Sequence, residues 1–278
     1  MITLQNLWDS HMHTAFSGDS DTDPMLQINR AKELGLRGIT ITDHLDLDFY
    51  DNPGQFDLDL PAYHSYFDNI KKEYGEDAPF TVRKGLELGL QTHLTERHHT
   101  LLSESDFDYV IGSIHQIDKE DPYYSYFYEG KSIVDIYRRN YELTLENLKL
   151  FKDIDTLGHL DYIRRYAIRE KGSELGDYSY SDHEEFLDAI LQFIIKNDIA
   201  LEVNSGAFRA GLDEPNPKYC VIKRYKELGG KLITMGADAH VPEHVALNFV
   251  PVAEALVGLG FDSYFTYISR KPVEFPFQ

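Results

Sequence analysis

Two histidines near the start of the chain, His11 and His13, are separated by one residue. An extended strand would project both imidazoles from the same face, where they could hold one metal ion. Four later runs of strand-like composition also end in His or in Asp-x-His, and the segment Asp238–His240 is one example. We therefore expect several strand ends to contribute ligands to one polynuclear metal site.

Nine side chains stand at or shortly after the ends of predicted strands. They are His11, His13, Asp19, His44, Glu87, His115, His159, Asp238 and His240. Nine ligands are too many for one tetrahedral zinc ion, but they fit two or three metals that share carboxylates. The single cysteine, Cys220, excludes a thiolate cluster, so the set favours Zn, Fe or Mn. The remaining histidines are expected on the surface or in loops: His64, His93, His98, His99, His183 and His244.

Alternating strand-like and helix-like runs predict an α/β fold with a parallel sheet, closed as a barrel or open. The predicted strands are Asn6–His11, Gly38–Thr42, Phe80–Leu86, Asp108–Ile114, Asp155–Gly158, Ala200–Asn204 and Lys231–Gly236, with Tyr264–Ile268 as an eighth strand or a closing segment. The predicted helices are Pro24–Leu34, Leu60–Tyr74, Ile133–Phe151, Asp182–Asn197 and Pro217–Leu228. In a barrel the carboxyl ends of the strands meet at one face, which would gather the nine ligands.

Two stretches, Asp118–Gly130 and Arg164–Asp177, are predicted to be long loops after strands. Loops in that position carry binding functions in such folds. We find no repeat, low-complexity tract or flexible linker, so we expect a single domain over residues 1–278.

The formal net charge of -20 argues against a nucleic-acid-binding surface and requires a local positive centre for any anionic substrate. Asp19, Glu87 and Asp238 contribute about -3, and three divalent ions would leave the site at about +3. Such a pocket would attract a phosphate ester. Because we find no basic leader and no long apolar segment, we expect a soluble, cytoplasmic protein without membrane contacts.

Three arginines follow predicted strands and could bind phosphate oxygens through their guanidinium groups. Arg164 and Arg165 come shortly after the fifth strand, and Arg209 follows the sixth strand, which supplies no metal ligand. Since ion pairs with surface carboxylates are common, we expect at least one of the three, rather than all, to contact phosphate.

The chain resembles the polymerase-and-histidinol-phosphatase (PHP) family in a series of short motifs that run from the first strand to the seventh. These are Asp9–Thr14, Ile41–His44, Gly85–Glu87, Gly112–His115, Gly158–His159 and Gly236–His240. The resemblance implies a distorted (β/α)7 TIM-like barrel of the PHP type with a trinuclear centre of Zn, Fe or Mn.

Two longer segments, Gly158–Arg165 and Glu202–Arg209 followed by Glu214–Pro217, resemble the stand-alone phosphatases of that family. This resemblance implies hydrolysis of a small phosphate monoester, L-histidinol phosphate, to L-histidinol and phosphate in histidine biosynthesis. One position departs from the family, because Asp19 stands where other members often have His. The departure affects the identity and affinity of one metal.

The implied mechanism has Glu87 bridging two metals, a metal-bridging hydroxide attacking phosphorus, and the arginines neutralising phosphate charge. A metal-bound water, Asp161 or His44 could protonate the leaving oxygen. Acidic or aromatic residues of Asp118–Tyr128 would meet the ammonium and imidazole of the substrate.

Three other functions remain open from the sequence. One is another PHP-family phosphoesterase, a nucleotide phosphatase or a nuclease, although the negative charge counts against it. Another is a non-catalytic metal-binding partner module. The third is an amidohydrolase-like barrel, which usually uses a lysine between its metals; Lys84 lies inside the third strand and is predicted to be a wall residue.

Overall fold

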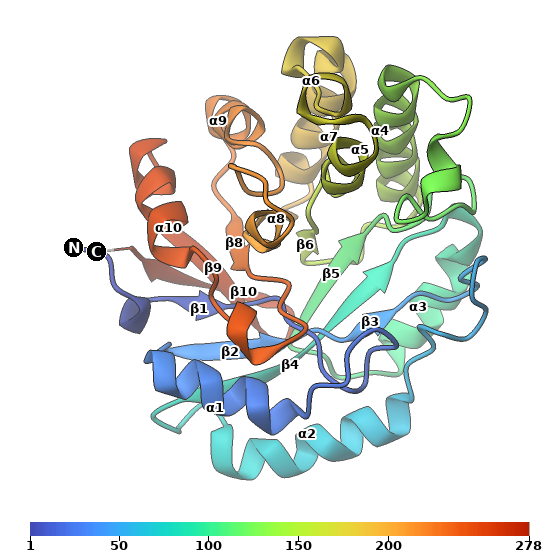
Figure 1. Cartoon of the computed structure of the whole chain (residues 1–278). Helices are drawn as coiled ribbons and strands as arrows, with labels where there is room; N and C mark the ends of the chain where they lie inside the picture. The colour runs from blue at the N-terminus through green and yellow to red at the C-terminus, as the bar shows by residue number, and fades with distance from the viewer. Residues whose placement is uncertain (278) are drawn as a thin grey trace.

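The computed structural model describes residues 1–277 and has a nearly closed barrel of seven parallel strands at its centre (Figure 1). In spatial order the strands are β1 (Trp8–Asp9), β2 (Gly38–Ile41), β4 (Thr81–Gly89), β5 (Tyr109–Ser113), β6 (Thr156–Leu157), β7 (Ala200–Asn204) and β8 (Ile233–Gly236). A short strand, β3 (His44–Leu45), pairs with β4 beyond the end of β2. The fold is the distorted (β/α)7 barrel predicted from the sequence.

Backbone hydrogen bonds near the ends of β1 and β8 connect the first and last strands of the barrel. Ser10 N donates to Met235 O at 2.9 Å, and His13 N donates to Ala239 O at 2.8 Å. A side chain at Gly236 would collide with His11, because an added Cβ would lie 2.4 Å from His11 Cβ. Glycine at this position therefore lets the first and last ligand-bearing segments lie side by side.

Helices surround the barrel (Figure 1). They are α1 (Pro24–Leu34), α2 (Leu60–Tyr74), α3 (Thr95–Ser103), α4 (Ile133–Leu150), α5 (Arg164–Lys171), α6 (Ser173–Gly176), α7 (Glu184–Lys196), α8 (Gly206–Arg209), α9 (Tyr219–Glu227) and α10 (Phe249–Gly258). The short 3-10 helices are η1 (Leu4–Asn6), η2 (Thr92–Leu94), η3 (Ser125–Tyr128), η4 (Tyr180–Asp182) and η5 (Pro242–His244).

Local sequence explains why the predicted helices are recovered within two residues at each end. In α1 the Asp23 carboxylate caps the first turn by accepting from Met25 N, and Pro24 occupies the first helical position. Gly35 ends the helix in a left-handed conformation with a φ of 76°. Signals of this kind depend only on neighbouring residues, so they can be recognised in the sequence.

The prediction of a loop over Arg164–Asp177 is wrong, because α5 and α6 occupy most of it. Arg164 and Arg165 are buried in the first turn of α5, so charged residues stand where a helix usually shows apolar ones. The other predicted loop, Asp118–Gly130, is largely confirmed and contains only η3. The prediction also missed α3 and α10.

Residues Tyr264–Ile268 do not form an eighth barrel strand. They belong to β9 (Ser263–Ile268), which pairs antiparallel with β10 (Lys271–Pro276) in a separate sheet. Tyr267 stacks on Tyr109, the first residue of β5. The hairpin therefore packs where the barrel strands begin, at the end opposite the predicted ligands.

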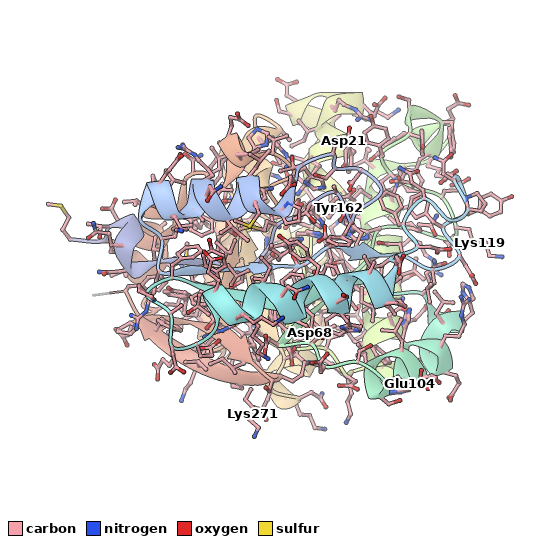
Figure 2. All side chains as sticks on the ribbon, turned by 90° about the horizontal axis from the view of Figure 1, so that it is seen from below. Asp21, Asp68, Glu104, Lys119, Tyr162 and Lys271 are labelled. Atoms are coloured by element: carbon pink, nitrogen blue, oxygen red, sulfur yellow. The ribbon has the colours of Figure 1, made fainter. Side chains whose placement is uncertain are left out.

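The apolar core fills the barrel and the space beneath the helices. Figure 2 shows the exposed residues Glu104, Lys119 and Lys271 at the edge of the molecule. Among residues 1–277, no helix is long and apolar enough to cross a membrane.

Candidate metal centre

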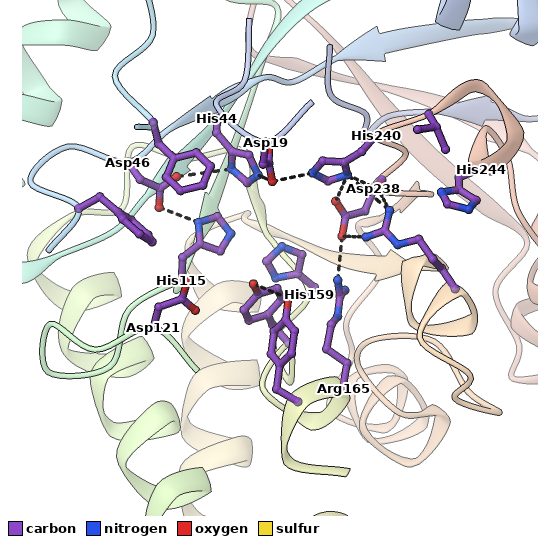
Figure 3. Close-up of a pocket in the computed structure, with 16 residues that line it drawn as sticks. Asp19, His44, Asp46, His115, Asp121, His159, Arg165, Asp238, His240 and His244 are labelled. Atoms are coloured by element: carbon purple, nitrogen blue, oxygen red, sulfur yellow. Dashed lines mark hydrogen bonds and ion pairs between the residues drawn. The ribbon is translucent and has the colours of Figure 1, made fainter. Parts of the chain in front are cut away.

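Eight of the nine predicted ligands come from the strands β3 and β4 or from segments directly after barrel strands, and Asp19 comes from the loop before α1. The structure brings all nine together at the end of the barrel where the strands finish. Six of them line one pocket (Figure 3): Asp19, His44, His115, His159, Asp238 and His240. The other three, His11, His13 and Glu87, are fully buried next to these. The strand order predicted this meeting, since parallel strands present their carboxyl ends on the same face.

Glu87 lies at the centre of the cluster and has no solvent exposure. Its Oε1 is 2.8 Å from His159 Nε2, and its Oε2 is 3.1 Å from His11 Nε2. Five imidazoles lie within 3.4 Å of its two oxygens: those of His11, His13, His44, His115 and His159. One carboxylate thus faces five imidazoles from four separate segments of the chain.

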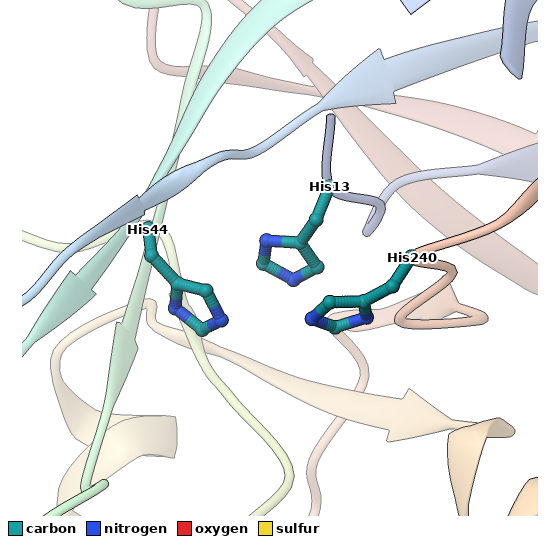
Figure 4. Close-up of side chains that lie close together, drawn as sticks. All are labelled: His13, His44 and His240. Carbon is teal, nitrogen blue, oxygen red and sulfur yellow. The ribbon is translucent and has the colours of Figure 1, made fainter. Parts of the chain in front are cut away.

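Side-chain groups within the cluster converge closely enough to share single ions. The ligand atoms of His11, His13 and Asp238 all lie within 4.8 Å of one another, and so do those of His13, His44 and His240. Figure 4 shows the second group, in which three imidazoles from three segments face a common point. Two further groups meet the same criterion: His11, Glu87 and His159, and His44, Asp46 and His115.

Asp19 joins the second of these groups, with its Oδ2 3.0 Å from His240 Nε2 and 3.7 Å from His44 Nε2. Its side chain remains about one-third exposed, with a relative accessibility of 34%. The departure from the family pattern therefore places a carboxylate, rather than an imidazole, at the solvent edge of the cluster.

The chemistry of the donor set fits divalent metal ions. Glu87 Oε2 and His44 Nδ1 are buried and make no hydrogen bond within the described residues. Burying an acceptor atom without a hydrogen-bond donor costs free energy, unless a cation binds its lone pair. Neutral imidazoles and carboxylates are the usual ligands of Zn, Fe and Mn.

Electrostatics keep several of these groups in the form that metals require. Burial lowers the pKa of His13, and the neighbouring His44 and His240 lower it further, so this imidazole stays neutral. Burial alone would raise the pKa of Glu87, but positive charge on His11 and His44 outweighs it and holds the pKa well below its usual range. Burial would lower the pKa of these two histidines, but the carboxylates raise it, so metal binding would have to displace their protons. Neutral His and ionised Glu are metal-binding forms.

Two carboxylates that the sequence analysis missed hold histidines of the cluster, Glu202 from behind it and Asp46 from the pocket wall. Glu202 Oε1 lies 2.6 Å from His11 Nδ1, and Asp46 Oδ1 lies 2.7 Å from His115 Nδ1. Such carboxylates fix the tautomer and direction of a metal-binding imidazole. Glu202 is a charged residue inside the buried strand β7, and this is the one signal in the sequence that could have identified it.

The pocket in front of the cluster has a volume of about 300 Å³. One side carries Arg165 and Arg209, whose guanidinium groups lie 3.2 and 3.5 Å from Asp238 Oδ2. The other side carries Asp121 among aromatic rings, and burial raises the pKa of Asp121 to about 6. The remaining lining includes Phe49, Phe56, Tyr162, Tyr166, Val241 and His244. His244, expected on the surface or in a loop, thus reaches the pocket.

Two predicted site residues, Arg164 and Asp161, join neither the lining of the pocket nor the ligand groups. Arg164 pairs instead with Asp177, at 2.9 Å, and with Asp213, at 3.3 Å. Asp161 is fully buried beside the pocket wall, and its carboxylate accepts hydrogen bonds from Asn216 and Tyr178. Both side chains lie outside the lining of the pocket, because neighbours in the surrounding loops hold them.

Comparisons with known proteins agree with this geometry. The chain is 32% identical over 245 residues to a probable histidinol-phosphatase of Clostridium acetobutylicum, covering 87% of this chain and 90% of that protein. It is 28% identical to the histidinol-phosphatase of Lactococcus lactis, with 95% of each chain covered.

The crystal structure of the Lactococcus lactis histidinol phosphate phosphatase, complexed with zinc, L-histidinol and phosphate, superimposes with a TM-score of 0.85 at 26% identity. That match covers 96% of this chain and 99% of the other. The sequence pattern of the PHP domain matches residues 9–206, which is more than half of the chain. The chain therefore belongs to the PHP family.

Proposed function

We propose that this protein is a metal-dependent phosphatase that hydrolyses L-histidinol phosphate to L-histidinol and phosphate. One observation carries the proposal: a buried glutamate, Glu87, lies among five imidazoles, and three of these line a pocket that also holds two arginines. Relatives that match nearly the whole chain are named for this activity.

Two or three divalent ions would be held by the nine predicted ligands, with Asp46 as a further candidate beside His44 and His115. Glu87 is placed to share its two oxygens between ions, because His11 faces one oxygen and His159 the other. Such ions would supply positive charge for the phosphate oxygens and a nucleophile from water at neutral pH.

Arg165 and Arg209 bind the phosphate group in this proposal. In the structure both guanidinium groups form ion pairs with Asp238, and each has further N–H donors that can reach a phosphate oxygen. Both side chains line the pocket, so positive charge meets the substrate on the side opposite Asp121.

The organic part of the substrate binds on the side of Asp121 and the aromatic rings. The Asp121 carboxylate accepts one hydrogen bond, from Tyr123 N at 2.8 Å, and has no ion-pair partner among residues 1–277. It can therefore accept from an ammonium group, while Phe49 and Phe56 offer apolar surface to an imidazole ring. This arrangement suits a substrate with an anionic end and a cationic end.

The leaving oxygen takes its proton from water in the pocket. Of the two side chains considered for this step, Asp161 lies outside the pocket lining. His44 does line the pocket, but its nitrogens face Glu87 and Asp19, which places it among the metal ligands. Neither side chain is free to deliver the proton.

No observation favours the alternative functions over this one. The net charge of -20 is unfavourable for a nuclease, and the nearly complete ligand set is more than a silent binding module needs. Lys84 Nζ bonds to His64 Nδ1 at 2.9 Å, away from the pocket, so it does not supply the lysine of an amidohydrolase-like site. The cytoplasmic location stays a prediction.

The direct test measures phosphate release from L-histidinol phosphate by the purified, metal-loaded protein. We expect turnover, and we expect His240→Ala to lose most of it. His93→Ala is the matched control, because His93 is exposed and pairs only with Asp48. Hydrolysis of another monoester without turnover of histidinol phosphate would contradict the proposed substrate.

A further inference from the structure

A chain of hydrogen bonds connects the buried Asp161 carboxylate to Arg165 in the pocket. Asn216 Nδ2 donates to Asp161 Oδ1 at 2.5 Å, and Arg165 Nη2 donates to Asn216 Oδ1 at 3.4 Å. We propose that Asp161 and Asn216 act as positioning residues that hold the Arg165 guanidinium in the direction required to bind phosphate. This inference rests on the proposed function, since it assigns Arg165 to the phosphate of the substrate.

The direction of the Asn216 amide follows from the chemistry of its neighbours. An ionised carboxylate only accepts hydrogen bonds, so Asn216 must turn its NH2 group toward Asp161. Its carbonyl oxygen must then point toward Arg165, whose guanidinium only donates. The Asp161 carboxylate thus determines that Arg165 faces the carbonyl oxygen of the Asn216 amide.

Asp161 is itself held in place through its second oxygen. Tyr178 OH donates to Oδ2 at 2.8 Å, and the backbone N–H of Lys218 donates to the same atom at 3.1 Å. The ammonium group of Lys218 also pairs with Asp177, the partner of Arg164. Through Asp177 and Lys218, Arg164 therefore stabilises this hydrogen-bond network on the side away from the pocket.

Arg165 has donors to spare. Its side chain is 93% buried, since its relative accessibility is 7%, and its Nε makes no hydrogen bond within the described residues. Nη1 donates to Asp238 Oδ2 at 3.2 Å, and the ring of Tyr162 lies 4.8 Å from the guanidinium carbon. A fork held by Asn216 on one side can present its remaining N–H groups to an anion in the pocket.

Replacing Asp161 by Asn is expected to reverse the amide. Two donors meet Oδ2 of Asp161 and one meets Oδ1, so the oxygen of the new amide would stay with Tyr178 and Lys218. The new NH2 group would then face Asn216, which would have to turn its own NH2 group toward Arg165. The NH2 group of Asn216 would then face the guanidinium of Arg165, and both are donors. Arg165 would lose the hydrogen bond that holds its guanidinium in place.

The test is a double-mutant cycle on the binding of inorganic phosphate to the metal-loaded protein, followed by calorimetry. We expect Asp161→Asn to weaken phosphate binding about tenfold in the wild-type background. We expect the same substitution to change the affinity less than about twofold in an Arg165→Ala background. A purely structural role would lower the affinity equally in both backgrounds.

Tyr178→Phe is the matched control. It removes one hydrogen bond to Asp161 but leaves the carboxylate facing Asn216, so it should lower the melting temperature without changing phosphate affinity. If Asp161→Asn does not fold, Asn216→Ala takes its place in the cycle, because the Asn216 backbone bonds to Asn204 do not depend on its side chain.

Unchanged phosphate affinity, or equal losses in the two backgrounds, would overturn the inference. The measurement uses phosphate alone, so it is independent of which monoester is the substrate. The protein could bind phosphate with the predicted dependence on Asp161 and Arg165 but not hydrolyse histidinol phosphate. That result would contradict the proposed substrate and would still support Asp161 and Asn216 as positioning residues.

Discussion

Glu87 and Asp161 are both fully buried carboxylates in or just after barrel strands, yet their surroundings differ completely. The oxygens of Glu87 face five imidazoles from four segments, and one of these oxygens has no hydrogen bond. Both oxygens of Asp161 accept hydrogen bonds, from Asn216, Tyr178 and the backbone of Lys218. Glu87 is suited to share its charge with cations, whereas Asp161 fixes the positions of its neighbours.

The pKa directions of the two carboxyls reflect the same difference. Burial raises the pKa of Asp161, and hydrogen bonds from neutral groups together with Arg164 only partly offset it. At Glu87 the surrounding imidazoles outweigh burial, and the pKa falls well below its usual range. Burial alone therefore does not identify a functional carboxylate, and the kind of neighbour does.

The largest effect is expected from Glu87→Gln, which keeps the size of the side chain and removes its charge. We expect kcat/KM to fall on the order of 10³-fold and the number of bound metals to drop, because the amide cannot share two anionic oxygens between ions. Asp161→Asn should keep kcat within about tenfold of wild type. For both variants, phosphate release measures the activity and elemental analysis measures the number of bound metals.

A Glu87→Gln protein that retains more than about a tenth of the activity would place the chemistry elsewhere.

Arg164 and Arg165 extend the comparison to adjacent residues. Arg165→Ala should lower kcat/KM for L-histidinol phosphate about 100-fold, since it removes a donor from the phosphate side of the pocket. Arg164→Ala should instead lower the melting temperature, because it leaves Asp177 without its bidentate partner. Steady-state kinetics and thermal unfolding of both variants separate the two roles.

The reverse pattern, with the larger kinetic loss in Arg164→Ala, would contradict the geometry of the pocket.

Glu202 tests whether a carboxylate behind the cluster acts through its histidine. Glu202→Gln should weaken metal binding about 10- to 100-fold, since His11 would lose the partner that fixes its tautomer. Competition with a chelator measures the affinity without any substrate. Glu227→Gln is the control on the helix surface, and equal metal retention in the two variants would exclude the role.

Asp121 should give the smallest effect, limited to substrates with a cationic end. Asp121→Asn is expected to raise KM for L-histidinol phosphate about tenfold and to leave p-nitrophenyl phosphate within about twofold. Asp118→Asn is the matched control, because Asp118 lies in the same loop but pairs with Arg139. Equal losses on both substrates would show that Asp121 does not bind the cationic end.

The sequence predicted the barrel and the gathering of nine ligands because both depend on local patterns. His11, His44 and Glu87 each lie in or close behind a β-rich run, and parallel strands bring such ends together. The helical caps at Asp23 and Asp59 are equally local, which explains why α1 and α2 were predicted to the residue.

The residues that sequence analysis missed act through neighbours far away in the chain. Glu202 meets His11 across 191 positions, and Asn216 meets Arg165 across 51. These contacts depend on strand order and on loops that fold against each other, and no spacing in the sequence records them. Asp161 was one of three candidates for proton transfer, and the contacts with Asn216 and Tyr178 that keep it out of the pocket lining also come from later segments.

The central claim is that this pocket is a polynuclear metallophosphatase site, and metal titration of activity tests it most directly. Chelator-treated protein should release no phosphate from L-histidinol phosphate. Stepwise addition of Mn²⁺ or Zn²⁺ should restore turnover and reach its maximum at two or three ions per chain. Full activity in protein shown by elemental analysis to be free of metal would contradict the account.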